Sequence, residues 1–496
     1  MAIFDFSDPL PPQPEQPGRG KRFPLKTALA IAVMGGVLAI WRLKVDRGKG
    51  MSAGLLAQTF RLHWPSPPPP PVPVQAATRA PGRTGMSESP LFVDASNNLD
   101  PFFAALWSLE RSKTGVITIL HYGDSPTTAD LITGEIRSRL QARFGDAGRG
   151  YTLIAKPWAW YGHDGVGMSG SGWKTRTAVG LMREGMYGLG GAAFDGRQGA
   201  WSKFRLTASP QSEAEVSYLV RPGGGAFMVE ADGDRLAVQT TDAPAPAEAV
   251  LRLALPAGTK TISIEPAEGA VTLFGVDFRR GSTGVLYDSL GLNGATTSVL
   301  ARVLQPALWK EELAHAHPDL VIINYGSNES SFGDWVHTRY GDELRLAIGR
   351  IRMAAPGACI LVMSPMDRGE RSGLDQIKTM DTIPEIVAIQ REVAAETHVA
   401  FFDTFDAMGG SGTMARWYGA SPRLVTADLL HPTPQGAGIV GALFVRQLSL
   451  RYDRWKMRHG IVLPVPVKAA IKVAATGNAP QGAKPHKPAD RRAQAG

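Results

Sequence analysis

Cysteine is almost absent from this chain, and long hydrophobic runs are absent too. Cys359 is the single cysteine in 496 residues, so an intrachain disulfide and any metal site built on two cysteines are excluded. We expect Cys359, in "ACILVMSP", to be a buried thiol in a strand, because free cysteine is among the most buried residue types. An uncharged, mostly apolar run at 27–41 has only fifteen positions. As a helix it would span about 22 Å, less than the ~30 Å hydrocarbon core of a bilayer.

This short run still bears on where the protein resides. Lys26 and Arg42 flank it and could snorkel to the membrane surface. We therefore predict a signal anchor or transmembrane helix at 23–42, after a cytoplasmic basic tail at 1–22. A cleaved signal peptide and a buried core helix are the alternatives. The first two interpretations place the rest of the chain in the cell envelope or periplasm, anchored in the inner membrane, or secreted if the segment is cleaved.

The central part of the chain carries no net positive charge. Of the formal net charge of +8, residues 1–49 hold +4 and residues 456–496 hold +7, which leaves −3 for the residues between them. A nucleic-acid groove needs basic residues on the folded body itself, so we expect no nucleic-acid partner. The proline-rich stretch at 43–95 is predicted to be an extended linker, and 461–496 a disordered basic tail.

Between these flanks, strand-like apolar runs alternate with helical patterns. Runs such as "VITILHY", "DLVIINYG" and "CILVMS" alternate with helical patterns at 128–143, 296–313, 333–354, 382–396 and 434–452. This alternation predicts an α/β fold whose parallel sheet is covered by helices on both faces. From about 200 to 281 the period changes to two, with a hairpin signal in "ADGD". We therefore predict a three-layer α/β/α domain at 96–150 and 282–460, with an inserted β-sandwich at 151–281.

Four short stretches place polar residues just after predicted strands. Ser125, in "HYGDSPTTAD", follows the first strand, at the edge where parallel sheets bind ligands. A nucleophilic serine needs a base and an orienting group, and "TADLLHPTPQGAG" offers His431 with Asp428 three residues earlier. Gly294 in "SLGLNGATT" and Asn328 in "INYGSNES" could donate N–H groups to an oxyanion. Each residue alone is as well explained by a turn, but their order at four strand ends predicts a serine acyl-transfer site.

The stretches "GDS", "NGATT", "GSNE" and "DLLHP" resemble the four blocks of the SGNH (GDSL-type) hydrolase superfamily. The resemblance spans roughly 110–450. It implies that Ser125 is the nucleophile, that His431 is the base, and that Asp428 is the partner of the base. It also implies that the Ser125 backbone N–H, Gly294 and Asn328 form the oxyanion hole. No cofactor or metal is expected.

The sequence departs from the common pattern at two positions and has one long insertion. Pro126 stands where Leu or His usually follows the serine, and Glu329 stands where Asp often follows the asparagine. A sandwich inserted between Ser125 and Gly294 is similar to the Gram-negative peptidoglycan O-acetylesterases, whose insert resembles a carbohydrate-binding module. "RFGDAGRGY" and "DTFDAMGGSGTMARWYGASPRLVTADLLH" look like the same group.

The expected activity is that of a serine esterase that removes O-acetyl groups from a cell-envelope glycan, peptidoglycan being one such glycan. The alternatives are a glycan O-acetyltransferase with the same triad, a non-catalytic envelope glycan-binding protein, and a lipase or thioesterase. Trp158, Trp160 and Tyr161 suit stacking on sugars at least as well as they suit a long apolar cleft. The expected partners are an acetylated glycan and, through the N-terminal helix, a membrane.

Overall fold

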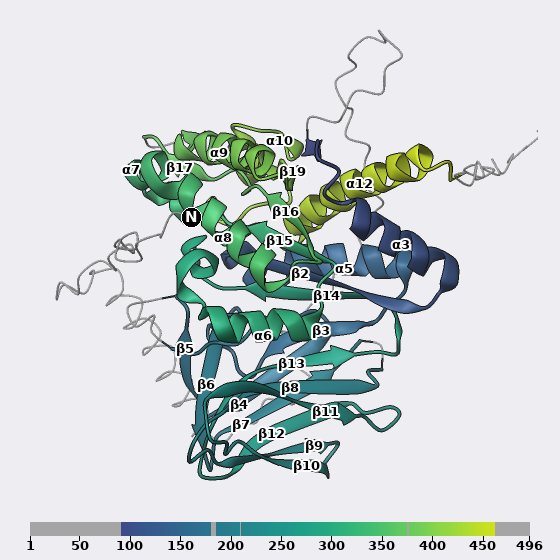
Figure 1. Ribbon diagram of the computed structural model, residues 1–496. Coiled ribbons are helices and arrows are strands. Elements are labelled where there is room, and N and C mark those ends of the chain that lie inside the picture. Colours follow the sequence, from purple (N-terminus) through teal and green to yellow (C-terminus); the bar gives the residue numbers. More distant parts are fainter. Residues whose placement is uncertain (1–90, 180–184, 209, 374–375, 462–496) are drawn as a thin grey trace, which may run out of the picture. The chain divides into compact units, whose positions relative to one another are not determined.

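The computed structural model describes residues 91–179, 185–208, 210–373 and 376–461 (Figure 1). The chain divides into two compact units, residues 1–447 and residues 448–496. The segments predicted at 1–22 and 23–42, all but the end of the predicted linker at 43–95, and the tail from 462 onward lie outside the described residues. Among the helices that are described, none is both long and apolar enough to cross a membrane.

A six-stranded sheet forms the centre of the α/β part of the first unit. Its strand order is β1-β19-β16-β15-β2-β14, and only the edge strand β1 runs antiparallel to its neighbour. Cys359 is buried at the start of β16, as predicted. The bounds are β1 (Phe92–Val93), β2 (Gly115–Gly123), β14 (Thr283–Gly291), β15 (Leu320–Asn324), β16 (Cys359–Met363) and β19 (Ala400–Phe402).

Helices cover both faces of this sheet, which explains why its strands are apolar on both sides (Figure 1). On one face α6, α8 and α9 pack side by side, and α3 and α5 pack on the other. The helix α12 begins in the first unit and ends in the second. The bounds are α3 (Asp100–Ser112), α4 (Ser125–Thr128), α5 (Leu131–Phe144), η1 (Val299–Val303), α6 (Pro306–Ala316), η2 (Glu329–Ser331), α7 (Gly333–Trp335), η3 (Val336–Tyr340), α8 (Gly341–Ala354), α9 (Thr382–Glu396), α10 (Thr404–Ala407), α11 (Thr413–Gly419) and α12 (Pro434–Arg458).

Two of the predicted helices are interrupted. The pattern at 296–313 gives the π-helical turn η1 and then α6, which starts at Pro306. A proline disfavours helical backbone at the residue before it, and Gln305 is indeed extended, with ψ of 124°. The pattern at 333–354 is divided into α7, the π-helical turn η3 and α8.

Two antiparallel sheets form the predicted β-sandwich between β2 and β14. One sheet has the order β10-β9-β12-β7-β4, and the other has the order β11-β8-β13-β6-β5, with β3 also paired to β13. The turn between β9 and β10 is at Asp232 and Gly233, whose φ values of 52° and 98° are those that a type I′ hairpin requires. The bounds are β3 (Gly148–Leu153), β4 (Val166–Ser171), β5 (Lys174–Thr177), β6 (Ala192–Arg197), β7 (Trp201–Leu206), β8 (Glu213–Val220), β9 (Ala226–Ala231), β10 (Asp234–Thr240), β11 (Ala247–Ala254), β12 (Thr261–Glu268) and β13 (Ala270–Arg279); a separate small sheet pairs β17 (Gly369–Arg371) with β18 (Ile377–Thr379).

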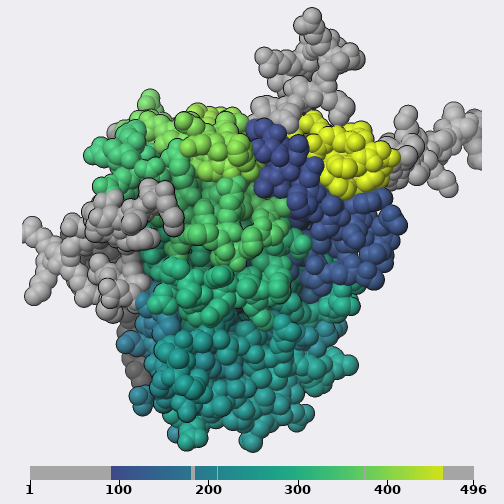
Figure 2. All heavy atoms as spheres, in the orientation of Figure 1, coloured from purple at the N-terminus to yellow at the C-terminus, as the bar shows by residue number. Residues whose placement is uncertain are grey.

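The sandwich and the α/β part share one hydrophobic core. Buried side chains of both parts, among them Leu120 of β2, Phe274 of β13 and Leu308 of α6, belong to a single contiguous cluster. In the space-filling view, the teal residues of the sandwich meet the green and blue residues of the α/β part along a continuous boundary (Figure 2). The insert is therefore packed onto the α/β part and is not a loosely tethered module.

Candidate active site

Ser125 lies at the joint between β2 and α4, at the carboxyl end of the parallel strands. Two glycines permit this tight joint. A Cβ on Gly123 would lie 2.2 Å from Thr127 Oγ1, and a Cβ on Gly291 would lie 2.5 Å from the backbone nitrogen of Thr128. Because neither glycine has a side chain, α4 can press against the ends of β2 and β14. This packing fixes Ser125 where it is 6% exposed.

His431 and Asp428 reach Ser125 from a tight loop that precedes α12. Val425 and Pro432 pair across this loop, and the backbone nitrogen of Thr426 donates to the carbonyl oxygen of His431 at 2.8 Å. His431 Nε2 lies 2.7 Å from Ser125 Oγ, and His431 Nδ1 lies 2.6 Å from Asp428 Oδ2. The fold thus joins the three predicted residues in one hydrogen-bonded chain.

The carboxylate of Asp428 is held by further donors. Its Oδ1 accepts hydrogen bonds from Thr426 Oγ1 at 2.6 Å and from the backbone nitrogens of Leu430 and His431 at 3.0 and 3.1 Å. Burial alone would raise the pKa of Asp428, but the hydrogen bonds from Thr426 and His431 outweigh it and lower the pKa to about 2. An ionised carboxylate can only accept, so His431 Nδ1 carries a proton, and in the neutral imidazole Nε2 then faces Ser125 as an acceptor.

Gly294 and Asn328 are joined to each other through the turn after β14. Gly294 has a φ of +77°, a conformation that favours glycine. Asn328 Nδ2 donates to the carbonyl oxygen of Ala295 at 2.8 Å, which uses one of its two amide N–H groups. Neither residue is among those that line the pocket at Ser125, although Asn293, next to Gly294, does line it.

The pocket at Ser125 has a volume of about 340 Å³. Small-molecule sites commonly measure roughly 300–1,000 Å³, so this one suits a small group such as an ester and its nearest neighbours. Four lining residues were not singled out from the sequence, namely Ala129, Leu131, Asn293 and Pro432. For Asn293 and Pro432 the signal was their adjacency to predicted residues. The lining is Ser125, Pro126, Ala129, Leu131, Trp160, Asn293, Asp428, His431 and Pro432.

Of the three aromatic residues considered for sugar stacking, only Trp160 is suitably placed. Its side chain is 56% exposed and lines the pocket. Tyr161 is buried, and its hydroxyl accepts a hydrogen bond from the backbone nitrogen of Leu153 at 3.0 Å. Trp158 packs against the hydrophobic core. The expectation for Tyr161 is therefore wrong, because its ring is buried, and the partly buried Trp158 is not among the residues that line the pocket.

Two buried carboxyl groups belong to the predicted blocks. Asp124, before the serine, has a pKa raised to about 7 by burial and then by the charge of Glu329. Glu329 accepts hydrogen bonds from the backbone nitrogen and Oγ1 of Thr297, at 2.7 and 2.8 Å, and from the backbone nitrogen of Gly326, at 3.1 Å. Glu329 thus ties the loop after β14 to the loop after β15.

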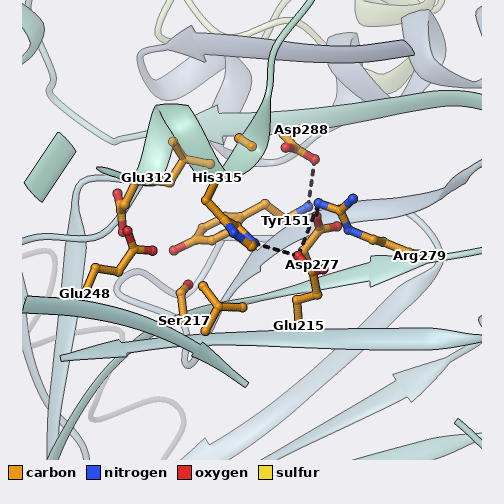
Figure 3. Close-up of a pocket in the computed structure, with 12 residues that line it drawn as sticks. Tyr151, Glu215, Ser217, Glu248, Asp277, Arg279, Asp288, Glu312 and His315 are labelled. Atoms are coloured by element: carbon orange, nitrogen blue, oxygen red, sulfur yellow. Dashed lines mark hydrogen bonds and ion pairs between the residues drawn. The ribbon is translucent and has the colours of Figure 1, made fainter. Parts of the chain in front are cut away.

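A second, smaller cavity of about 30 Å³ lies between α6 and the sandwich (Figure 3). At one end Glu215 accepts one hydrogen bond from His315 Nε2 at 2.9 Å and contacts the guanidinium of Arg279 at 3.2 Å. At the other end the carboxyl groups of Glu248 and Glu312 face each other within hydrogen-bonding reach. In the described part of the chain, no group of three or more His, Cys, Asp or Glu side chains is arranged to hold a metal ion.

Comparison with known proteins gives one family match and several matches to solved structures. Residues 261–439 match the GDSL-like Lipase/Acylhydrolase family, a range that contains Gly294, Asn328, Asp428 and His431 but begins after Ser125. No curated protein sequence matches the chain.

The fold is that of a solved peptidoglycan O-acetylesterase, with a TM-score of 0.64 and 22% identity over 73% of this chain and 99% of that chain. A family two carbohydrate esterase from Clostridium thermocellum matches with a TM-score of 0.26 and 14% identity over 58% of this chain and 100% of that chain. Residues 261–439 thus resemble the GDSL-like Lipase/Acylhydrolase family, and the fold, an α/β domain interrupted by a β-sandwich, is similar to that of the solved O-acetylesterase.

Proposed function

We propose that this protein is a serine esterase that removes O-acetyl groups from a glycan of the cell envelope, by way of an acyl-enzyme on Ser125. The observation that supports this most is the hydrogen-bonded chain from Ser125 Oγ through His431 to Asp428, at the wall of a pocket of about 340 Å³. A nucleophile, a base and a group that orients the base are the three parts that acyl transfer needs.

In the first half of the reaction, Ser125 Oγ attacks the acetyl carbonyl carbon while His431 Nε2 takes the hydroxyl proton. Asp428 stabilises the imidazolium that forms, because its carboxylate is ionised and accepts from Nδ1 at 2.6 Å. When the tetrahedral intermediate collapses, the bond between the acyl carbon and the sugar oxygen breaks. His431 returns the proton to that oxygen, and the sugar hydroxyl leaves.

In the second half, a water molecule gives its proton to His431 and attacks the acetyl carbon on Ser125. The bond to Ser125 Oγ breaks, acetate leaves, and the serine hydroxyl regains its proton. In both halves the negative oxygen needs fixed donors. The proposed donors are the backbone N–H groups of Ser125 and Gly294 and the remaining amide N–H of Asn328.

A glycan substrate in the envelope is the finer part of the proposal. The exposed ring of Trp160 at the pocket offers an apolar face on which a sugar can stack. The structural likeness to a peptidoglycan O-acetylesterase makes acetylated peptidoglycan the first substrate to test. The segment at 23–42 would anchor the enzyme in the inner membrane, and the proline-rich stretch would hold it away from the surface.

The test is hydrolysis of 4-nitrophenyl acetate, together with acetate release from O-acetylated peptidoglycan. Ser125→Ala and His431→Ala should each lower kcat by a factor on the order of 10⁴–10⁶, and the double variant should be little worse because the two residues act as a unit. Ser108→Ala changes an exposed serine on α3 and serves as the matched control.

Losses that multiply in the double variant would contradict the triad. Adding a glycan acceptor separates esterase from acetyltransferase, because a transferase would move acetate to the acceptor and release less of it into solution. Hydrolysis of the aryl ester without any release from peptidoglycan would leave an esterase whose substrate is a different ester.

A further inference from the structure

A groove of about 320 Å³ crosses the outer face of one sandwich sheet, well outside the pocket at Ser125. It lies on β4, β7 and β12, and its lining is Gly167, Met168, Ser169, Lys203, Arg205 and Thr261. On β7 buried and exposed residues alternate, so Trp201, Lys203 and Arg205 all point to the outer face. Successive outward side chains of a strand are about 7 Å apart, which arranges an aromatic ring and two cations in a row.

The two strands beside β7 place small residues opposite Lys203 and Arg205. Opposite Lys203 and Arg205, β4 presents Ser169 and Gly167, and β12 presents Ser263 and Thr261. Opposed residues in an antiparallel pair share a face, so both cations stand among small side chains. Within the described residues, neither Lys203 nor Arg205 forms an ion pair.

Glu230 of β9, opposite Ser263, and Glu265 of β12 lie on the same face, and within the described residues neither forms an ion pair with Lys203 or Arg205. A third acidic residue, Asp232, contacts Thr261 of the groove, but its hydrogen-bonding capacity is already used. The carboxylate of Asp232 accepts from the backbone nitrogen of Lys260 at 3.0 Å and from the backbone nitrogen and Oγ1 of Thr261 at 2.8 and 3.0 Å. It therefore secures the start of β12 and leaves the two cations available to an external anion.

The groove is tied to the pocket by a short, anchored segment. Trp160 lines the pocket and Gly167 lines the groove, and seven residues can span at most about 25 Å. On the α/β side, the backbone nitrogen of Asp164 donates to Asp130 Oδ2 at 2.8 Å. On the sandwich side, the backbone nitrogen of Thr207 donates to the carbonyl oxygen of Gly165 at 2.9 Å. One polymer chain can thus contact both places while the segment between them stays fixed.

We infer that this groove binds a carboxylate-bearing stretch of the same glycan chain whose acetyl ester lies at Ser125. Lys203 and Arg205 attract the carboxylates, and Trp201, which is 41% exposed, stacks on a sugar ring. The inference rests on the proposed function for the identity of the polymer. It adds that the insert selects an acidic glycan over a neutral one.

The test measures co-sedimentation of the full-length Ser125→Ala protein with purified peptidoglycan sacculi, so that acetate release plays no part. The pair Lys203→Gln and Arg205→Gln should weaken binding about threefold to tenfold, because exposed ion pairs contribute modestly. Amidation of the sacculus carboxyl groups should weaken binding of the parent protein by a similar factor. The pair Lys174→Gln and Arg197→Gln removes the same charge from exposed positions on the other sheet and should leave binding unchanged.

Several results would overturn the inference. The first is that the Lys203 and Arg205 variant binds sacculi as well as the parent protein does, or that the control pair weakens binding by the same factor. The second is that the parent protein binds amidated sacculi as well as untreated ones, or binds anionic lipid vesicles in place of sacculi. With Ser125 intact, the Lys203 and Arg205 variant should hydrolyse 4-nitrophenyl acetate at the normal rate, which shows that it is folded. Absence of that hydrolysis in the wild type would contradict the proposed function and leave the binding result standing.

Discussion

Replacing Glu248 with glutamine is expected to stabilise the fold at pH 8 and to have little effect at pH 5. Glu248 on β11 faces Glu312 on α6 across the small cavity (Figure 3). Burial raises the pKa of Glu312 well above its usual range, and repulsion from Glu248 adds to this. Burial likewise raises the pKa of Glu248 to about 7, although the charge of His315 offsets part of the rise. Glu312 therefore keeps its proton and donates it to Glu248, and the proton lost near pH 7 leaves Glu248 as a buried carboxylate.

The size of the effect follows from the pKa of Glu248, which rises from 4.5 in the unfolded chain to about 7 in the folded one. Between these values the folded state holds more protons, so its stability is greatest below pH 4.5 and falls as the pH rises through 7. Each unit of pKa difference between the folded and unfolded states is worth about 1.4 kcal/mol. The ionisation of Glu248 therefore lowers the free energy of unfolding by roughly 3 kcal/mol at pH 8 and by less than about 1 kcal/mol at pH 5. Glutamine removes this cost, and its amide can donate to Glu312.

Thermal unfolding midpoints at pH 5, 6, 7 and 8 test this prediction. The Glu248→Gln protein should unfold roughly 3–6 °C higher than wild type at pH 8, with the gain shrinking toward pH 5. Glu268→Gln, at an exposed position on β12, is the matched control and should show no such trend. A Glu248→Gln protein that unfolds at a lower temperature than wild type at pH 8 would mean that Glu248 is ion-paired in the folded state, and the argument from burial would be wrong.

Two further predictions concern the pocket. Asn328→Asp replaces a donor with a negative charge, so kcat for 4-nitrophenyl acetate should fall at least about 10²-fold with KM nearly unchanged. Loss of the hydrogen bond to Ala295 should also cost about 1 kcal/mol in the free energy of unfolding; a folded variant with normal kcat would place the oxyanion hole elsewhere. Trp160→Ala should raise KM for acetylated peptidoglycan about tenfold with unfolding unchanged, and an equal rise for the aryl ester would argue against sugar stacking.

Much of the fold could be predicted because it depends on local patterns. The buried strands β2, β15 and β16 are continuous apolar runs, and the β9–β10 hairpin follows from Asp232 and Gly233. The meeting of Ser125 with His431 was predictable for a different reason. The sequence places Ser125 at the carboxyl end of a parallel strand and His431 just before a helix. In such sheets both of these positions lie at the same edge. The interruption before α6 also had a local cause, in Pro306, that the helical pattern concealed.

Features that depend on how distant segments pack were not predictable in the same way. The sequence places Trp158, Trp160 and Tyr161 within four positions, and all three had equal standing as sugar-binding residues. Only the packing of the segment between β3 and β4 decides that Tyr161 points inward and Trp160 outward. The groove on the sandwich likewise arises from the pairing of β4 with β7 and of β7 with β12, and these strands are far apart in the sequence.

The pairing of Glu248 with Glu312 was predictable only in part. The sequence contains a signal for the burial of Glu312 and none for its partner. In α6 the buried residues Leu308, Trp309, Leu313 and Ala316 form an apolar stripe at helical spacing, and Glu312 falls inside that stripe. A carboxyl group there must be buried, so it must be neutralised or protonated. No pattern in β11 marks Glu248 as its partner, since that pairing is set by how α6 packs on the second sheet. A buried charge can therefore be predicted from the periodicity of one helix, whereas the group that accepts its hydrogen bond requires the three-dimensional structure.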